Sequence, residues 1–531
     1  MGVKGYPCYV DIRHVRMDFL YLPFWETKLP LKDLNHQVFW PAFLLLALTC
    51  AAAISIPEAF LHAAQQLNQW VLDHFDWLFS WSSLSFLILL SWVYFSDFSK
   101  QKIGGAAATP LLSKWQWFSI TLCSTLASGI IFWGTAEPIY HLHQPPSGLG
   151  LSPGSEAASQ FAMSSMLMHW TFTPYSIYTL LGLMFALMFY NMQQSFHLGA
   201  MLYPLTGRNT HNWMTDSINA ICLFTLVAGM SASLGTGILT ISGGLHRLLG
   251  VHQSTFVWLL ITLVTVATFV LSAVTGLLKG IRLLSDFNTK VFILLAVLVA
   301  LLGPTAGMLV IGGEGVYTYI ADFFPRSTQL AGIEAEWEQS WTVFYLANWF
   351  AWAPVAALFL GRIARGYTVR EFIRFNLLYP ALFSAVWMVI FSGTSLYVDL
   401  HVPGNPLKQV LNEHGPQNVV FEVMNQLPFG SVLSLVFLLT SFLSFVTAAD
   451  SNTSAMSGLS AGHISPQQAE APVGLKILWG CMVGAMAFLM IALAGIDGIK
   501  LLSTLGGFPA MLLSLGVFAA FIKLLWRKRR D

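Results

Sequence analysis

The chain has 531 residues, of which 56% are hydrophobic and only 10% are charged. A soluble domain carries roughly 25% charged residues, so this composition excludes an ordinary water-soluble protein and indicates a chain that lies mostly in lipid. The net charge of +1 argues against nucleic acid as a partner. The five cysteines show no spacing typical of a metal site or of a disulfide framework.

Stretches long enough to cross a membrane recur along the chain. A spanning helix needs about 20 mainly apolar residues. Twelve stretches meet this condition, and we predict a span at each. They are centred near Leu46, Leu87, Ile130, Thr179, Met230, Val264, Ala296, Trp349, Met388, Leu439, Ala485 and Leu513.

The lysines and arginines predict the orientation of these spans, because basic residues stay on the cytoplasmic side. With twelve spans, both ends of the chain lie on one side. Of the 26 basic residues, the opposite side carries only Arg247, Arg326, Lys408 and Lys500. We therefore expect a multi-pass plasma-membrane protein, in a bacterium an inner-membrane protein, with both termini in the cytoplasm and lipid as its surroundings.

The residues do not favour an enzyme within the membrane. Such an enzyme needs a nucleophile, a carboxylate pair or a metal set within its spans. The sequence has no HExxH motif and no GxSxG motif with plausible partners. His141 and His143, at one end of the third span, are interpreted as interfacial residues. A channel would need a repeated pore loop, and the sequence shows none. Of the three classes of membrane protein considered, the transporter is therefore favoured.

The third span has an unusual centre. Its segment "CSTLASGIIFWGTAEPIYHL" (Cys123 to Leu142) is rich in glycine and hydroxyl residues. Such residues weaken a helix and let backbone carbonyls face a ligand, although they also serve tight helix packing. Glu137 precedes a proline near the predicted outer end. We expect it to act as a gate or a brace.

Two other spans carry aromatic residues at helical spacing. Trp349 and Trp352 lie three residues apart near the middle of the eighth span, and Tyr175 and Tyr178 lie three apart in the fourth, which begins near Met168. Packing between helices, or an outer aromatic belt for Trp170, would explain them too. A wall of tryptophan and tyrosine also suits a cation without N–H groups, such as quaternary ammonium.

Several segments resemble the betaine/carnitine/choline transporter family. They are "FWGTAEPIYH" (Phe132 to His141), "HWTFTPYSIY" (His169 to Tyr178), "GMSASLGTGILTISGGL" (Gly229 to Leu245), the stretch from Trp341 to Ile373, and "FVTAADSNTSAMS" (Phe445 to Ser457). They follow one another in the family's order over almost the whole chain.

The resemblance implies an all-α membrane fold with two peripheral helices before two inverted five-helix repeats, like the sodium/amino-acid symporters. It also implies alternating access and a homotrimer. The implied divisions are a cytoplasmic tail (1–38), peripheral helices (39–100), the first repeat (115–312), an outer loop or surface helix (313–337), the second repeat (338–526) and a basic C-terminal segment (527–531).

The resemblance also implies a substrate site. The family's aromatic box falls on Trp170, Tyr175, Tyr178 and Trp349, and its inner aromatic position falls on Trp352. The second box position is usually Trp and is Tyr175 here. A position that is often Trp is Asn348, which either binds the substrate's carboxylate or hydroxyl or faces a neighbouring helix. Choline-selective members tend to carry Asp at the position of Gly129, so its absence favours a zwitterion.

No cofactor is expected, although sodium is a candidate coupling ion. In sodium-coupled relatives, one ion lies between the third and tenth spans. The resemblance places its backbone carbonyl ligands at Cys123, Leu126 and Ser444 and its hydroxyl pair at Thr447 and Ala448, so one hydroxyl is lost. Asp450 lies nearby and is interpreted as a brace or a participant in proton coupling.

The resulting expectation is a secondary transporter, not an enzyme, for a quaternary-ammonium or sulfonium zwitterion such as betaine, carnitine or dimethylsulfoniopropionate. The alternatives are a choline or other small-solute transporter on the same scaffold and a sodium-independent exchanger. A non-transporting sensor is disfavoured because no cytoplasmic signalling domain is evident.

Overall fold

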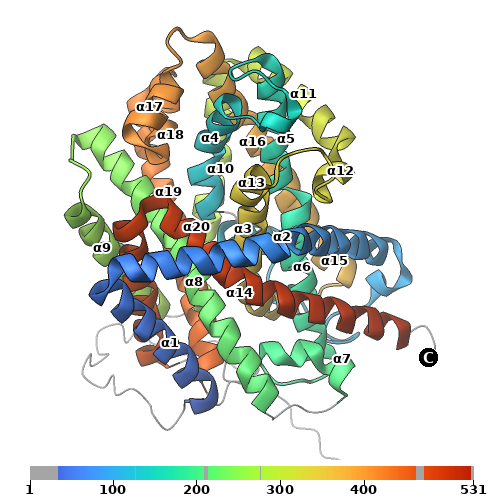
Figure 1. Cartoon of the computed structure of the whole chain (residues 1–531). Coiled ribbons are helices and arrows are strands. Elements are labelled where there is room, and N and C mark those ends of the chain that lie inside the picture. Colours follow the sequence, from blue (N-terminus) through green and yellow to red (C-terminus); the bar gives the residue numbers. More distant parts are fainter. Residues whose placement is uncertain (1–33, 126, 208–212, 276, 462–471, 528–531) are drawn as a thin grey trace, which may run out of the picture.

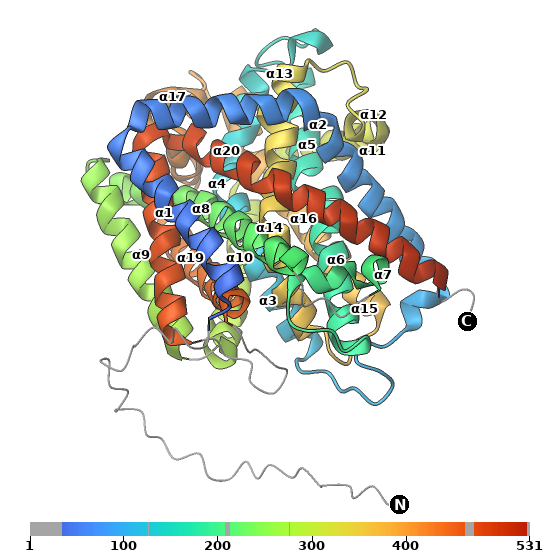
Figure 2. The ribbon, with the colours of Figure 1, turned by 60° about the horizontal axis from the view of Figure 1, so that its bottom comes forward.

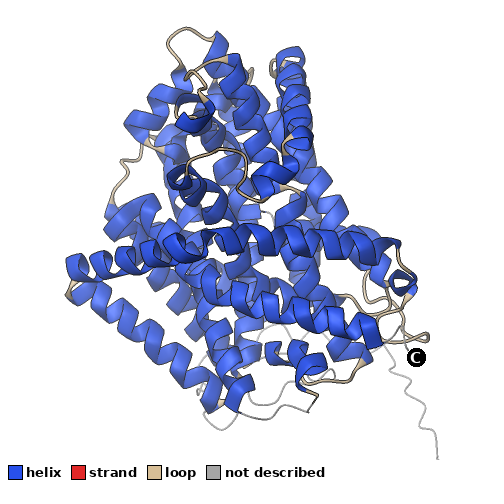
Figure 3. Ribbon diagram, turned by 45° about the vertical axis from the view of Figure 1, so that its right-hand side comes forward, coloured by secondary structure: helices blue, strands red, loops and turns tan. Residues whose placement is uncertain are grey.

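The protein is built from helices that pack into one bundle (Figures 1 and 3). The computed structural model describes residues 34–125, 127–207, 213–275, 277–461 and 472–527. Within these ranges no strand forms, and the only bridges are the isolated pairs Leu34–Ala461 and Lys102–Thr368. The predicted all-α membrane class is therefore confirmed.

Ten helical segments in the described part of the chain are long and apolar enough to cross a membrane. Seven are the single helices α1 (His36–Ser55), α2 (Pro57–Phe95), α8 (Trp213–Leu249), α9 (Thr255–Thr275), α10 (Leu277–Leu302), α19 (Gly430–Ser460) and α20 (Val473–Arg527). The other three join neighbouring elements: α5 (Glu156–Trp170) with α6 (Phe172–Ala186), α13 (Ala335–Glu338) with α14 (Phe344–Ile363), and α15 (Val369–Ile373) with α16 (Tyr379–His401).

The sequence predicts twelve spans, two more than these ten segments, and the difference arises in two parts of the chain. Helix α20 has 55 residues and contains Gly495 at φ 54 and ψ −128, so two helices meet there. Glycine tolerates this conformation because it has no Cβ. The predicted third span corresponds to α3 (Lys114–Thr125) and α4 (Ala127–His143), which lie on either side of residue 126, outside the described residues. The count of twelve and the unwinding of the third span stay predictions.

Shorter helices cap the bundle. They are α7 (Tyr203–Thr206), α11 (Thr305–Ala321), α12 (Phe323–Ser327), α17 (Pro406–His414) and α18 (Val419–Asn425). The predicted outer segment 313–337 thus begins inside α11, a helix that packs on α5 and α16. Helix α11 begins at Thr305, before the predicted boundary at residue 313, because the chain turns at Pro304 and the helix follows directly.

Burial separates the central helices from the peripheral ones. The apolar windows of α5–α6 and of α13–α14 are 94% buried, whereas those of α1 and α9 are 28% buried. Glycine allows the central backbones to approach closely: a Cβ on Gly507 of α20 would lie only 2.2 Å from the Ala347 carbonyl oxygen of α14. Trp349 and Trp352 are buried in α14, so they do not anchor the chain at the lipid surface. Figure 2 shows α14 crossed by α20, with α1 and α9 at the edge.

The fourth predicted span is longer than expected and is interrupted. It begins at Glu156, well before Met168, because Ser155 caps it by accepting a hydrogen bond from the Ala158 backbone N–H at 3.1 Å. The serines of α5 lower the hydropathy of this segment, which is why the sequence predicted a start near Met168. Thr171, at φ −117 and ψ −122, separates α5 from α6.

Candidate functional site

Four aromatic residues from two distant segments meet in the centre of the bundle. The ring centroid of Trp349, on α14, lies 4.8 Å from Tyr178, 5.0 Å from Tyr175 and 6.0 Å from Trp170. All four side chains are buried. We call this group the aromatic box. It consists of the four residues to which the family resemblance assigns the box.

The break at Thr171 fixes the orientation of Trp349. The last carbonyls of a helix have no partner within it, and they need one when they are buried. Here the His169 carbonyl, at the end of α5, accepts a hydrogen bond from Trp349 Nε1 at 3.2 Å. The indole of α14 is thereby tied to the backbone of the helix that carries Trp170.

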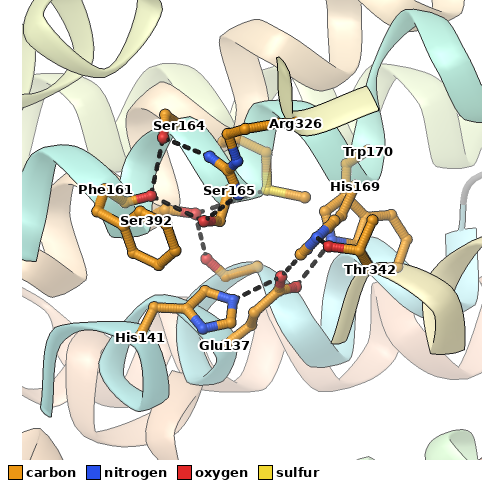
Figure 4. Close-up of polar contacts among 12 residues, drawn as sticks. Glu137, His141, Phe161, Ser164, Ser165, His169, Trp170, Arg326, Thr342 and Ser392 are labelled. Carbon is orange, nitrogen blue, oxygen red and sulfur yellow. Dashed lines mark hydrogen bonds and ion pairs between the residues drawn. The ribbon is translucent and has the colours of Figure 1, made fainter. Parts of the chain in front are cut away.

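A cluster of polar side chains around Glu137 is hydrogen-bonded to Trp170 of the box (Figure 4). Glu137 Oε1 lies 2.6 Å from His169 Nδ1 and 3.1 Å from His141 Nε2. Its Oε2 accepts a hydrogen bond from Trp170 Nε1 at 2.9 Å. All these groups are buried, and both oxygens of the carboxylate are engaged. This geometry supports the bracing role expected of Glu137, because its carboxylate holds the indole of Trp170.

The interpretation of His141 as an interfacial residue was wrong, because its side chain is fully buried. His143 is also engaged, with its Nε2 2.5 Å from Asp399 Oδ2. The spacing of Glu137 and His141, four apart on one helix, was the available signal. The part played by His169 was not visible, because it comes from another helix.

The same three side chains are a candidate metal-ligand group, since their ligand atoms all lie within 4.8 Å of one another. Ligands bound tetrahedrally at about 2.0 Å would stand roughly 3.3 Å apart. The 2.6 Å separation between Glu137 and His169 is instead a hydrogen-bond distance. The geometry is therefore that of a hydrogen-bonded cluster.

Gly129 of α4 lies directly against the box. A Cβ at this position would come within 2.4 Å of Cη2 of Trp170. The indole thus rests on the helix backbone where any other residue would push it away. Gly129, the position at which choline-selective members of the family tend to carry Asp, is therefore next to the candidate substrate site.

The remaining predicted substrate residues lie along the same helix. Asn348 Oδ1 accepts a hydrogen bond from Ser503 of α20 at 3.1 Å, so this oxygen faces a neighbouring helix. Trp352 is buried one turn from Trp349 and stacks on no other ring of the described residues.

The candidate sodium residues only partly come together. Cys123 of α3 and Ser444 of α19 both contact Asn288 of α10, with Nδ2 3.9 Å from Cys123 Sγ and 2.7 Å from Ser444 Oγ. Thr447 and Ala448 are buried on α19. Leu126 lies outside the described residues.

Asp450 is buried on the same helix. Its Oδ2 accepts a hydrogen bond from Ser272 Oγ at 2.5 Å, and its Oδ1 has no hydrogen-bond partner among the described residues.

A buried aromatic box beside interrupted helices, in a bundle of membrane-spanning length, defines the class of protein. It is a membrane transporter. The model of the betaine/carnitine/choline family transporters matches residues 37–530, so the chain belongs to that family. Its relatives are transporters, and it is not an enzyme.

The curated relatives have low sequence identity to this chain, over nearly all of its length. A glycine betaine transporter of Acinetobacter baylyi is 28% identical over 94% of this chain and 74% of its own. An ectoine/hydroxyectoine transporter of Virgibacillus pantothenticus is 28% identical over 93% and 97%. An osmo-dependent choline transporter of Acinetobacter baylyi is 26% identical over 93% and 72%.

Among solved structures, a Na⁺-coupled sialic acid symporter in a substrate-bound outward-open state is similar at a TM-score of 0.47 and 13% identity. The similarity covers 83% of this chain and 86% of the other.

Proposed function

We propose that this transporter moves a zwitterion with a quaternary-ammonium or sulfonium group, and that the aromatic box binds the cationic end. The observation that carries this proposal is the arrangement of Trp349, with three further rings around it at centroid distances of 4.8 to 6.0 Å. Ring faces attract a diffuse cation, by about 2 kcal/mol for a contact removed from water.

The hydrogen bonds of Glu137 indicate that the aromatic rings, and not this carboxylate, bind the substrate's cation. Both oxygens of Glu137 are occupied by Trp170 and two histidines. The cation would therefore meet the box without a free acidic group, which suits a substrate that carries its own carboxylate. Of the substrates named for the relatives, glycine betaine has both features, ectoine is a zwitterion without a quaternary-ammonium group, and choline has the quaternary-ammonium group without a carboxylate.

Uptake into proteoliposomes tests this proposal. Betaine, carnitine, dimethylsulfoniopropionate, ectoine and choline would be compared as labelled substrates, with and without sodium and with a pH gradient. We expect saturable uptake of a methylated zwitterion. Uptake of choline alone would favour the alternative of a choline transporter on the same scaffold, and uptake of none of them would overturn the proposal.

We further propose that sodium drives uptake, bound between α3 and α19. Hard cations need several oxygen ligands. Ala448 removes one hydroxyl, but Asn288 Oδ1 and Ser285 Oγ are buried near Cys123 without a hydrogen-bond partner among the described residues. Oxygens left unsatisfied in this way are costly unless a ligand meets them, and they offer a replacement for the missing hydroxyl. A homotrimer with cytoplasmic termini in a bacterial inner membrane completes the proposal.

Substitution of Thr447 by Val tests the sodium proposal. We expect Thr447→Val to raise the sodium concentration for half-maximal uptake about tenfold, because one hydroxyl ligand is worth about 1.4 kcal/mol. Thr440→Val is the matched control, since both threonines are buried on α19 and both donate to the carbonyl four residues earlier. Equal sodium dependence of the two variants would exclude Thr447 as a ligand.

A further inference from the structure

A polar cavity of about 640 Å³ lies between α2, α20 and the turn before α14. Its lining includes Asp73, Glu336, Asp497 and Lys500. It is of the size that ligand sites usually have. Helices α2 and α20 cross in both ribbon views (Figures 1 and 2). By the distribution of basic residues, this end of the bundle is the predicted outer side.

Lys500 has unusual surroundings in this cavity. Its Nζ lies 4.8 Å from the ring centroid of Trp341 and 5.6 Å from that of Phe344. No described residue forms an ion pair or a hydrogen bond with this ammonium group. Lys290, by contrast, forms an ion pair with Asp286 at 2.7 Å. The half-buried ammonium of Lys500 thus has no carboxylate of the described residues within the 4.0 Å of an ion pair, and Asp497 and Glu137 act on it only from further away.

We infer that this cavity is an entry site in which Lys500 binds the carboxylate of the zwitterion before its cationic end reaches the aromatic box. A carboxylate is the group that a desolvated ammonium binds best, through charge-assisted hydrogen bonds. The acidic residues Asp73, Glu336 and Asp497 share the cavity. They attract the opposite end of the same molecule.

The cationic end also has a partner in this cavity. Lys500 occupies the aromatic surface of Trp341 in the structure. A quaternary-ammonium group competes for the same surface, because it is attracted by the same ring face. A zwitterion can therefore displace the lysine from Trp341 and hold it through its carboxylate.

A column of packed rings lies between the entry site and the aromatic box. Trp341, Tyr345 and Trp349 lie four residues apart along one face of the helix. The centroid of Trp341 is 6.4 Å from that of Tyr345, and Tyr345 is 5.0 Å from Trp170 of the box. These rings mark the route that we infer for the cation from Trp341 towards Trp349.

Kinetics of Lys500 variants test this inference, which rests on the proposed function. We expect Lys500→Gln to raise KM for the transported zwitterion about tenfold and to change kcat by less than about twofold. Lys500→Arg should keep KM within about threefold. Lys408→Gln is the control, because Lys408 is an exposed lysine on the same predicted side that does not line the cavity. A KM for Lys500→Gln equal to that of the control, or a loss confined to kcat, would overturn the inference.

A ligand without a positive charge tests the site in the unaltered protein. The carbon isostere of betaine, 3,3-dimethylbutanoate, has the same shape and carboxylate but no cation. We expect it to bind purified wild-type protein in isothermal titration, and to bind Lys500→Gln at least about fivefold more weakly. Absence of binding to the wild type at a hundredfold the substrate's KM would overturn the inference even if the variant fails to fold.

These measurements separate failure of the entry site from failure of the proposed function. If no methylated zwitterion is transported but the isostere binds through Lys500, the proposed substrate is wrong and the carboxylate site stands. If betaine is transported but the isostere does not bind, the aromatic box stands and the entry site is wrong.

Discussion

Replacement of Trp349 by Ala is expected to abolish measurable uptake, with a loss of at least about a hundredfold in kcat/KM. Trp349 is the only ring that contacts each of the other three members of the aromatic box. Loss of one desolvated cation–π contact costs about 2 kcal/mol, or roughly thirtyfold. The effect should be larger here, because the hydrogen bond to the His169 carbonyl is also lost. Initial uptake rates and direct titration of the substrate measure this effect.

Two further variants separate binding from folding. Trp213, on α8, is 77% exposed, so Trp213→Ala should leave uptake unchanged. Trp349→Phe keeps a ring but loses the indole N–H, and we expect intermediate affinity with a normal unfolding temperature. If Trp349→Ala binds the substrate with unchanged affinity while the protein stays folded, the aromatic box is not the substrate site.

Replacement of Gly129 by Ala is expected to reduce kcat/KM about a hundredfold without lowering stability in proportion. The new methyl group would stand 2.4 Å from Trp170 Cη2, so the indole must move. A misplacement of about 1 Å in a positioning group costs a factor of this order. Alanine is also the better helix former, by about 1 kcal/mol, which offsets part of the cost.

Gly134 provides a matched control on the same helix. A Cβ at Gly134 would first meet the indole nitrogen of Trp387 at 3.4 Å, which is ordinary contact. We therefore expect Gly134→Ala to bind and transport the substrate nearly as the wild type does. Equal losses in both variants, or none in Gly129→Ala, would show that close contact between α4 and Trp170 does not shape the site.

The aromatic residues of the site could be predicted from the sequence because their number, spacing and depth are local properties. Trp349 lies far from the basic residues that mark the end of its span, so an interfacial role was already disfavoured. Tyr175 and Tyr178 share a helix face by their spacing alone. That they would meet Trp349 was implied only by the family resemblance.

The supports of the site could not be predicted in the same way. Glu137, His169 and Thr342 belong to three segments, and His169 Nε2 lies 3.1 Å from Thr342 Oγ1. Nothing local to any one of them specifies the others. The interruption at Thr171 was also missed, because its neighbours keep the apolar pattern of a continuous helix.

Asn348 is a single residue whose contact could not be predicted from the sequence. Its place in the sequence allowed either a substrate contact or a helix contact. The structure directs its oxygen to Ser503, more than 150 positions along the chain. Which alternative applies to an amide depends on the neighbour that packing brings to it.

The sequence by itself determined that this chain crosses the membrane many times, that it is helical, and that Trp349 and Trp352 lie near the middle of a span. These properties follow from hydropathy, charge and helical period, each of which acts over a few turns. Only the tertiary structure decided that Glu137 holds Trp170, that Gly129 carries its ring, and that Lys500 faces a polar cavity in which no described carboxylate is within ion-pair distance of it. Such contacts depend on how whole helices pack, because that packing decides which distant side chains become neighbours.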